Sequence, residues 1–256
     1  ERLVGSEMCI RDRHMSVYEI YFSPTGGTKK VSNILTEQLG NEVITVDLTM
    51  NQTEHQNVKI EQDDIAVISV PSYGGRVPDV AVKRLMTLQG NDARAIIVCV
   101  YGNRAYEDTL VELRDTAQNA GFQVIAAVSA IAEHSIVRQF ATGRPDKQDT
   151  QQLLKFSEEI RKKISSDNIE EPNIPGNRPY KKAGGAGLVP KPSKECLKCG
   201  VCAKECPVQA IDMNNPKKVN SDLCISCMRC ISVCPNGARK VNAVALSAVG
   251  IALKKV

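Results

Sequence analysis

The 256-residue chain has no apolar run that approaches the roughly 20 residues needed to span a membrane. Its basic residues never form a block of more than three, and the formal net charge is only +4. Trp is absent, and no paired acid and base residues or nucleophile motif stands out. We therefore expect no membrane span and no nucleic-acid partner.

Residues 1–14 are charged and lack the continuous apolar region of a signal peptide. We interpret them as a leader that is not part of the natural protein, with the natural start at Met15. Because no export signal is present, the ten cysteines are expected in cytoplasmic, reducing surroundings rather than in a disulfide framework.

Eight of the ten cysteines form two runs with the same spacing, C-x2-C-x2-C-x3-C-P, and the second run repeats the first 28 positions later. Bacterial ferredoxins use this spacing to hold [4Fe–4S] clusters, and the fourth cysteine of each run binds the cluster of the other run. We therefore predict two clusters. One is assigned to Cys196, Cys199, Cys202 and Cys234, and the other to Cys206, Cys224, Cys227 and Cys230.

Structural zinc is the main alternative, but it is usually held by two separated C-x2-C pairs and not by a run of four that ends in proline. The remaining cysteines, Cys9 and Cys99, are isolated. Cys99 lies in the apolar run Ile96 to Val100, where we expect a buried, inert thiol. Because iron–sulfur clusters are oxidisable, oxygen-poor surroundings are expected.

A strand-like run, Val17 to Phe22, leads into the small hydroxyl- and glycine-rich loop Ser23 to Thr28. A helix follows, with apolar residues on one face at Val31, Ile34, Leu35 and Leu39. Such a loop before a helix N-terminus can bind a phosphate, although a plain turn is the alternative. No G-x-x-x-x-G-K-[ST] pattern is present, which favours a static cofactor phosphate over nucleotide hydrolysis.

Strands and helices continue to alternate along the next 140 or so residues, a spacing typical of a doubly wound parallel sheet. Further strands are predicted at 42–47, 64–70, 95–101 and 122–132, with helices between them and a last helix that contains Leu153, Phe156, Ile160 and Ile164. In such sheets ligands bind beyond the carboxyl ends of the strands. The loops after the first, third and fourth strands are therefore expected to converge on one site.

The segment Ser23-Pro-Thr-Gly-Gly-Thr28 is similar to the flavodoxin phosphate loop, and the loops Ser72 to Pro78 and Tyr101 to Tyr106 match those that hold the isoalloxazine ring. Together with the cysteine runs, the chain resembles the flavodoxin–dicluster ferredoxin fusion family from about Met15 to Lys240. The resemblance implies a flavodoxin-like α/β fold, with a doubly wound five-stranded parallel sheet in the order 2-1-3-4-5. It also implies a small α+β dicluster ferredoxin domain.

The resemblance divides the chain into a flavodoxin-like domain (15–165), a linker rich in proline and glycine (166–192), a ferredoxin domain (193–240) and an apolar tail (241–256). It implies two [4Fe–4S] clusters and FMN as cofactors. The FMN phosphate would be held by Ser23, Thr25, Gly26, Gly27 and Thr28. The ring would be held by Ser72, Tyr73, Gly74, Gly75, Tyr101, Gly102, Asn103, Arg104 and Tyr106.

Several roles stay open at this point. Tyr73 or Tyr106 would stack on the flavin, or each is a core or rim aromatic. Arg76 or Arg104 would favour the reduced, anionic flavin, or both face solvent. His134 is either a surface residue or lies near the flavin. The linker is either a strap that fixes the ferredoxin domain against the flavodoxin-like domain and could cover the flavin edge, or a flexible tether.

The combined cofactors predict an electron-transfer protein that couples one- and two-electron redox partner proteins, because clusters carry single electrons and FMN carries one or two. Two alternatives remain. The chain would be a flavin-dependent reductase of a small molecule that its own clusters supply with electrons, or an iron–sulfur redox sensor with an empty flavodoxin fold.

Overall fold

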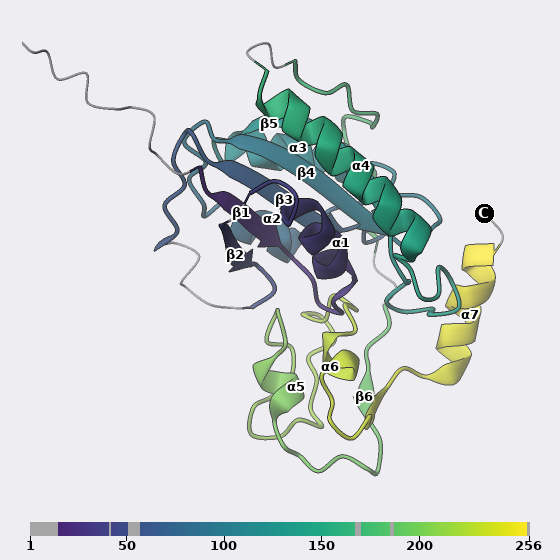
Figure 1. The fold of residues 1–256 in the computed structure, drawn as a ribbon. Coiled ribbons are helices and arrows are strands. Elements are labelled where there is room, and N and C mark those ends of the chain that lie inside the picture. The colour runs from purple at the N-terminus through teal and green to yellow at the C-terminus, as the bar shows by residue number, and fades with distance from the viewer. Residues whose placement is uncertain (1–14, 41, 51–56, 167–169, 185–186, 255–256) are drawn as a thin grey trace, which may run out of the picture.

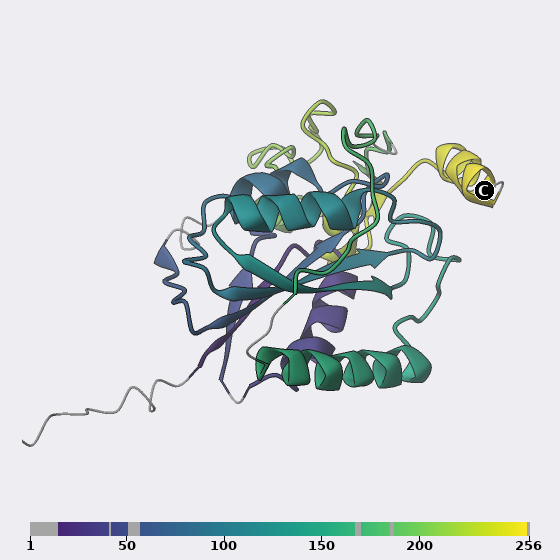
Figure 2. The same ribbon diagram turned by 90° about the horizontal axis from the view of Figure 1, so that it is seen from above.

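The structure is a computed structural model that describes residues 15–40, 42–50, 57–166, 170–184 and 187–254. The residues interpreted as a leader, together with Cys9, lie outside the described residues. Two views of the fold are given in Figures 1 and 2.

Five parallel strands form the central sheet in the order β2-β1-β3-β4-β5 (Figure 1). In the middle of the sheet, Ile20 of β1 lies opposite Val46 of β2 and Ile68 of β3. This order is that of the flavodoxin-like doubly wound fold, so the predicted fold class is confirmed. The strands are β1 (Val17–Tyr21), β2 (Val43–Asp47), β3 (Ile65–Pro71), β4 (Arg94–Tyr101) and β5 (Gln123–Ile131).

Helices cover both faces of the sheet, so β3 and β4 are buried on both sides and consist largely of apolar residues (Figure 2). One face carries α1 (Gly27–Thr36) and α4 (Lys147–Ile164), which bury Val31, Leu35 and Leu153 against it. The other face carries α2 (Asp79–Leu85) and α3 (Thr109–Asn119), which bury Leu85 and Leu113. Two apolar cores therefore fix the sheet and the loops at its ends.

The C-terminal part of the chain lies at the end of the sheet where α1 begins, which is the carboxyl end of the strands (Figure 1). This part has its own small apolar core, the third in the molecule, which contains cysteines of both runs together with Ala210 and Ile211. Its elements are short: β6 (Lys191–Pro192) pairs antiparallel with β7 (Arg239–Lys240), and the helical turns are α5 (Val201–Lys204) and α6 (Arg229–Ser232).

The apolar tail forms a helix, α7 (Ala243–Lys254). Gly250 is buried there and lies close to Val137 and Gln139 in the loop between β5 and α4, while Val244 and Ile251 are exposed. No helix in the described part of the chain is both long enough and apolar enough for a membrane crossing.

Candidate functional site

A cavity of about 370 Å³ opens at the carboxyl ends of the strands, within the usual size range of small-molecule sites. The loops after β1, β3 and β4 converge on it, as the strand pattern predicts, and the loop after β5 joins them. Ten of the predicted FMN-contacting residues line the cavity: Thr25, Gly27, Thr28, Ser72, Tyr73, Gly74, Gly75, Tyr101, Gly102 and Arg104.

The other four predicted residues lie beside the cavity rather than in its lining. Ser23 is buried, and its hydroxyl accepts a hydrogen bond from the N–H of Lys29 at 2.9 Å, so it shapes the loop from within. Gly26 and Asn103 have positive φ angles of 90° and 64° and turn their loops. The Tyr106 ring packs edge-on against Tyr101, with ring centroids 5.4 Å apart, and so supports the cavity wall from behind.

The loop after β1 places the N-terminus of α1 at the cavity. Gly26 in the left-handed conformation starts the helix, and Gly27 and Thr28 of the first turn line the wall. The first N–H groups of a helix have no partner inside the helix, and the helix dipole favours an anion there. Thr25 and Thr28 add hydroxyl groups to the same lining. These residues fit a phosphate group.

The two arginines of the ring loops have different surroundings. Arg76 forms a two-point ion pair with Glu112, with both N···O distances 2.7 Å, and also donates to the Lys181 carbonyl. Its guanidinium lies over the ring of Tyr180 and is not in the cavity lining. Arg104 does line the cavity, 3.9 Å from Glu107. Of the two arginines, Arg104 is therefore the one that lies at the cavity.

His134, in the loop after β5, also lines the cavity. Its Nδ1 accepts hydrogen bonds from the N–H groups of Ile136 and Val137, both at 3.1 Å. Burial lowers the pKa of His134, which agrees with a neutral ring whose Nδ1 is an acceptor. The side chain thus holds the loop after β5 against Gly102, where an added Cβ would lie 2.5 Å from the ring.

Three further segments complete the cavity, and of these the sequence suggested only the linker, as a strap over the flavin edge. Lys181 and Gly184 come from the linker, Ile225 and Ser226 from the second cysteine run, and Val249 and Leu253 from α7. The rule that ligands bind beyond the carboxyl ends of parallel strands places only the loops that follow the strands. It gives no position for the second cysteine run or for α7. The apolar character of the tail was the one available signal for α7.

Tyr73 connects the cavity with the second cysteine run. Its backbone N–H donates to the carbonyl of Arg76 at 2.9 Å, which closes a tight turn and holds the tyrosine at the cavity wall. Burial, and then the nearby sulfur of Cys227, raise the pKa of Tyr73 well above its usual value. Tyr73 thus lines the cavity and lies within electrostatic range of the Cys227 sulfur.

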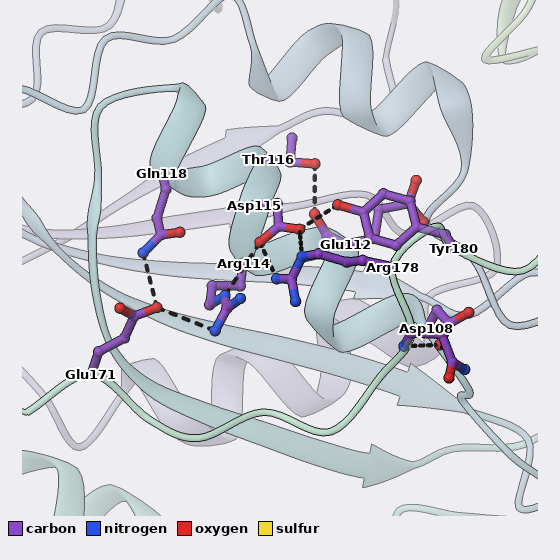
Figure 3. Close-up of polar contacts among 10 residues, drawn as sticks. Asp108, Glu112, Arg114, Asp115, Thr116, Gln118, Glu171, Arg178 and Tyr180 are labelled. Carbon is purple, nitrogen blue, oxygen red and sulfur yellow. Dashed lines mark hydrogen bonds and ion pairs between the residues drawn. The ribbon is translucent and has the colours of Figure 1, made fainter.

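The described linker residues 170–184, which we call the strap, are fixed along α3 (Figure 3). Arg178 forms a two-point pair with Asp115, which also accepts from Tyr180. Although burial acts to raise it, these partners hold the pKa of Asp115 below its usual range. Glu171 accepts from Gln118 in the last turn of α3. Residues 170–184 are therefore held against the domain and do not form a free tether.

Asp108 anchors the strap next to the cavity. Its Oδ1 accepts from the N–H and side-chain amide of Asn177 at 2.8 and 3.0 Å, and its Oδ2 accepts from the N–H of Lys181 at 2.6 Å. These bonds favour the charged carboxylate, and the backbone N–H of Lys181 is the main cause of the lowered pKa of Asp108. The stabilisation that the charged Asp108 carboxylate gives the strap is present at neutral pH. It is lost as the pH falls through the lowered pKa of Asp108.

Replacing Asp108 with alanine is expected to open the strap, because the N–H groups of Asn177 and Lys181 lose their charged acceptor. Each such bond contributes about 1.5–3 kcal/mol, so limited proteolysis within 170–184 should become at least about tenfold faster. The exposed Asp63→Ala serves as the matched control. Equal cleavage rates in the two variants would show that Asp108 does not anchor the strap.

Each set of four cysteines assigned to one cluster surrounds its own hollow. The hollow lined by Cys196, Cys199, Cys202 and Cys234 is called the outer hollow, since Cys199 is exposed. The hollow lined by Cys206, Cys224, Cys227 and Cys230 is called the inner hollow, since Ile225 and Ser226 beside it also line the large cavity. The nine cysteines that the structure describes are all free thiols. The fourth cysteine of each run thus joins the hollow of the other run.

The local geometry around the sulfurs fits thiolate ligands of a cluster. The N–H of Ala210 donates to the Cys206 sulfur at 3.3 Å, and that of Ala238 donates to the Cys234 sulfur at 3.2 Å. Burial raises the pKa of the Cys227 and Cys230 thiols to about 12. Thiolates at these positions therefore need a positive partner, which the iron of a cluster provides. Among the described residues no group of His, Cys, Asp or Glu is arranged for a single metal ion.

Two arginines fix the inner hollow against the flavodoxin-like sheet. Arg84 on α2 donates to the carbonyls of Leu48 and Thr49, and through its other nitrogen to the carbonyl of Pro207 at 2.6 Å. Arg229 on α6 donates to the carbonyl of Pro24 at 3.2 Å. Pro207 and Arg229 both line the inner hollow. The hollow is thus held close to the loop Ser23 to Thr28 by direct contacts.

Comparison with known families supports the C-terminal assignment. Residues 195–238 match the family model of the 4Fe-4S dicluster domain. Polyferredoxin proteins MvhB of Methanothermobacter thermautotrophicus and Methanothermobacter marburgensis are each 30% identical over 57 residues, which is 22% of this chain. The matched segment spans 14% of the length of these curated relatives.

Solved structures similar to the N-terminal part include flavodoxins. The two-electron reduced flavodoxin of Megasphaera elsdenii is 15% identical, with a TM-score of 0.39, and the match covers 57% of this chain and 99% of that one. Flavodoxin 1 of Bacillus cereus is 15% identical, with a TM-score of 0.41, and the match covers 57% of this chain and 97% of that one. The strand order of the sheet independently has the flavodoxin-like topology.

Proposed function

We propose that this chain, which joins a flavodoxin-like fold to a 4Fe-4S dicluster domain, transfers electrons between two [4Fe–4S] clusters and an FMN in the same chain. The observation that carries the proposal is the shared wall of the large cavity. Ile225 and Ser226, which line it, lie between the ligand candidates Cys224 and Cys227. The flavin site and the inner cluster site are therefore immediate neighbours.

The residues around the cavity support FMN as the occupant. The N-terminus of α1, with Thr25 and Thr28, would hold the phosphate. The glycine pair Gly74 and Gly75 brings backbone close to the cavity, and Tyr73 would pack against the ring. When bound, FMN would accept or donate one or two electrons, whereas each cluster carries one. The two kinds of cofactor together would couple one- and two-electron redox partners.

The arrangement of the hollows supports an order of the sites along the electron path. The outer hollow lies under Leu197, whose side chain is 74% exposed, and under the exposed Cys199. A partner protein would exchange electrons there, at the surface. The inner hollow shares Ile225 with the lining of the large cavity, whereas the outer hollow shares no lining residue with it. The path would therefore run between the surface, the outer cluster, the inner cluster and the flavin.

Anaerobic purification with iron, sulfide and flavin measured per chain tests this proposal. We expect about eight iron atoms and about eight sulfides from two clusters, with one FMN. Full iron without FMN would favour the redox-sensor alternative, and a chain without acid-labile sulfide would overturn the proposal. Saturable turnover of a quinone or nitro compound would identify the chain as a reductase that its clusters supply.

A further inference from the structure

The two cysteine runs form matched halves of one structure, as the 28-residue repeat suggests. Backbone φ angles agree at equivalent positions: 56° at Lys198 and 53° at Ser226, and 78° at Gly200 and 62° at Met228. The N–H···S bonds of Ala210 and Ala238 described above are equivalent in the same way. Differences between the two hollows therefore arise from side chains rather than from the course of the backbone.

The halves differ in charge at one buried position. Ile211 follows the Cys-Pro-x-x-Ala segment of the first run, and Arg239 follows that of the second. The exposed fraction is 5% for Ile211 and 2% for Arg239, so both side chains are inside the protein. At this position one half thus has a hydrocarbon where the other has a cation. The inner hollow is lined by a different arginine, Arg229, but that side chain forms an ion pair with Glu205, whereas Arg239 has no carboxylate partner among the described residues.

Arg239 is aimed at the outer hollow, which it lines. Its Nη2 donates to the Cys202 sulfur at 3.3 Å and to the Pro216 carbonyl, and its Nη1 donates to the Pro190 carbonyl at 3.1 Å. Its Nε has no hydrogen-bond partner in the described part of the chain. The recorded partners of this buried cation are neutral carbonyls and a ligand sulfur, and none of them is a carboxylate.

A buried cation without a carboxylate is costly unless another negative charge lies nearby. The thiolates of a cluster in the outer hollow would provide that charge. Reduction of a cluster adds one more negative charge, which a cation at hydrogen-bond distance stabilises in a low-dielectric interior. The charge also acts on Cys224 and Cys230 of the inner hollow, but its direct bond is to Cys202.

We propose that Arg239 raises the reduction potential of the outer cluster above that of the inner cluster, so that the outer cluster is reduced first. The inference rests on the proposed function, because it requires two clusters in the chain. This difference in potential sets the order in which the two clusters are reduced. An electron from a surface partner would reside on the outer cluster, and the inner cluster would pass electrons to and from the flavin site.

Redox titration of the purified holoprotein, followed by visible absorbance and EPR, tests the inference. The wild type should show two separate one-electron cluster steps. Arg239→Gln keeps a side-chain N–H and removes the charge. It should lower the reduction potential of the upper step by at least 59 mV, which is a tenfold decrease in the ratio of reduced to oxidised cluster at a given potential. Arg239→Lys should retain most of the separation between the two steps.

Arg239→Ile makes the second half match the first and should bring the two steps together. Lys240→Ala removes the exposed cation of the next residue on β7 and should leave both steps unchanged. Unchanged potentials in Arg239→Gln with full iron would overturn the inference, as would loss of outer-cluster iron in both uncharged variants, which would assign Arg239 a structural role. A wild-type chain without two clusters would instead overturn the proposed function.

Discussion

A Cys227→Ala variant is expected to hold about four iron atoms in place of about eight and to lose electron transfer from its clusters to the flavin. Cys227 lines the inner hollow, its side chain is 8% exposed, and its sulfur acts on Tyr73 at the cavity wall. Alanine removes one of four ligands at the site closest to the flavin. Iron per chain and anaerobic stopped-flow reduction of FMN by a reduced ferredoxin measure the two effects.

Two further cysteine variants act as controls. Cys199→Ala should also lose about half of the iron, but it is expected to remove the outer cluster and leave the inner cluster, which, once reduced by the ferredoxin, can still reduce FMN. Cys99→Ala should keep all the iron, because Cys99 is buried in β4 and burial raises the pKa of its thiol far above its usual value. Full iron in Cys227→Ala would contradict the ligand assignment.

The sequence was sufficient for the sheet because its strands are short apolar runs between clear loop signals. Ile65–Pro71 and Arg94–Tyr101 are buried on both faces, and such strands need mostly apolar residues. The predicted ends of the five strands differ from the observed ones by at most one residue. The loops then followed from topology, since parallel strands place their carboxyl ends on one edge of the sheet.

The rest of the site depends on contacts that no periodic pattern encodes. Arg76 and Arg104 occupy similar loops, but Glu112 on α3 binds Arg76 and leaves Arg104 at the cavity. The strap is irregular, so its position follows from individual acceptors such as Asp108 and Asp115. The asymmetry at Arg239 is visible in the repeat, yet its importance appears only when the side chain is seen buried beside Cys202.

A Gly74→Ala variant is expected to bind FMN about 5- to 30-fold more weakly than the wild type, from a conformational cost of about 1–2 kcal/mol. Gly74 has a φ angle of +61°, and an added Cβ would lie 2.4 Å from the backbone carbonyl oxygen of Gly184 in the strap. The loop after β3 must therefore move away from the strap, and binding would have to restore its position. Titration of the flavin-free protein with FMN, followed by flavin fluorescence, gives the dissociation constant.

Gly143→Ala is the matched control for backbone strain. Its φ angle is +74°, and an added Cβ would meet no atom within 4 Å. It should therefore lower stability by a similar conformational cost without a change in FMN affinity. Iron content should be unchanged in both variants, because neither glycine lies in a cysteine hollow. Equal FMN affinity in Gly74→Ala and the wild type would mean that the loop after β3 does not hold the ring, and the flavin would have to be placed elsewhere in the cavity.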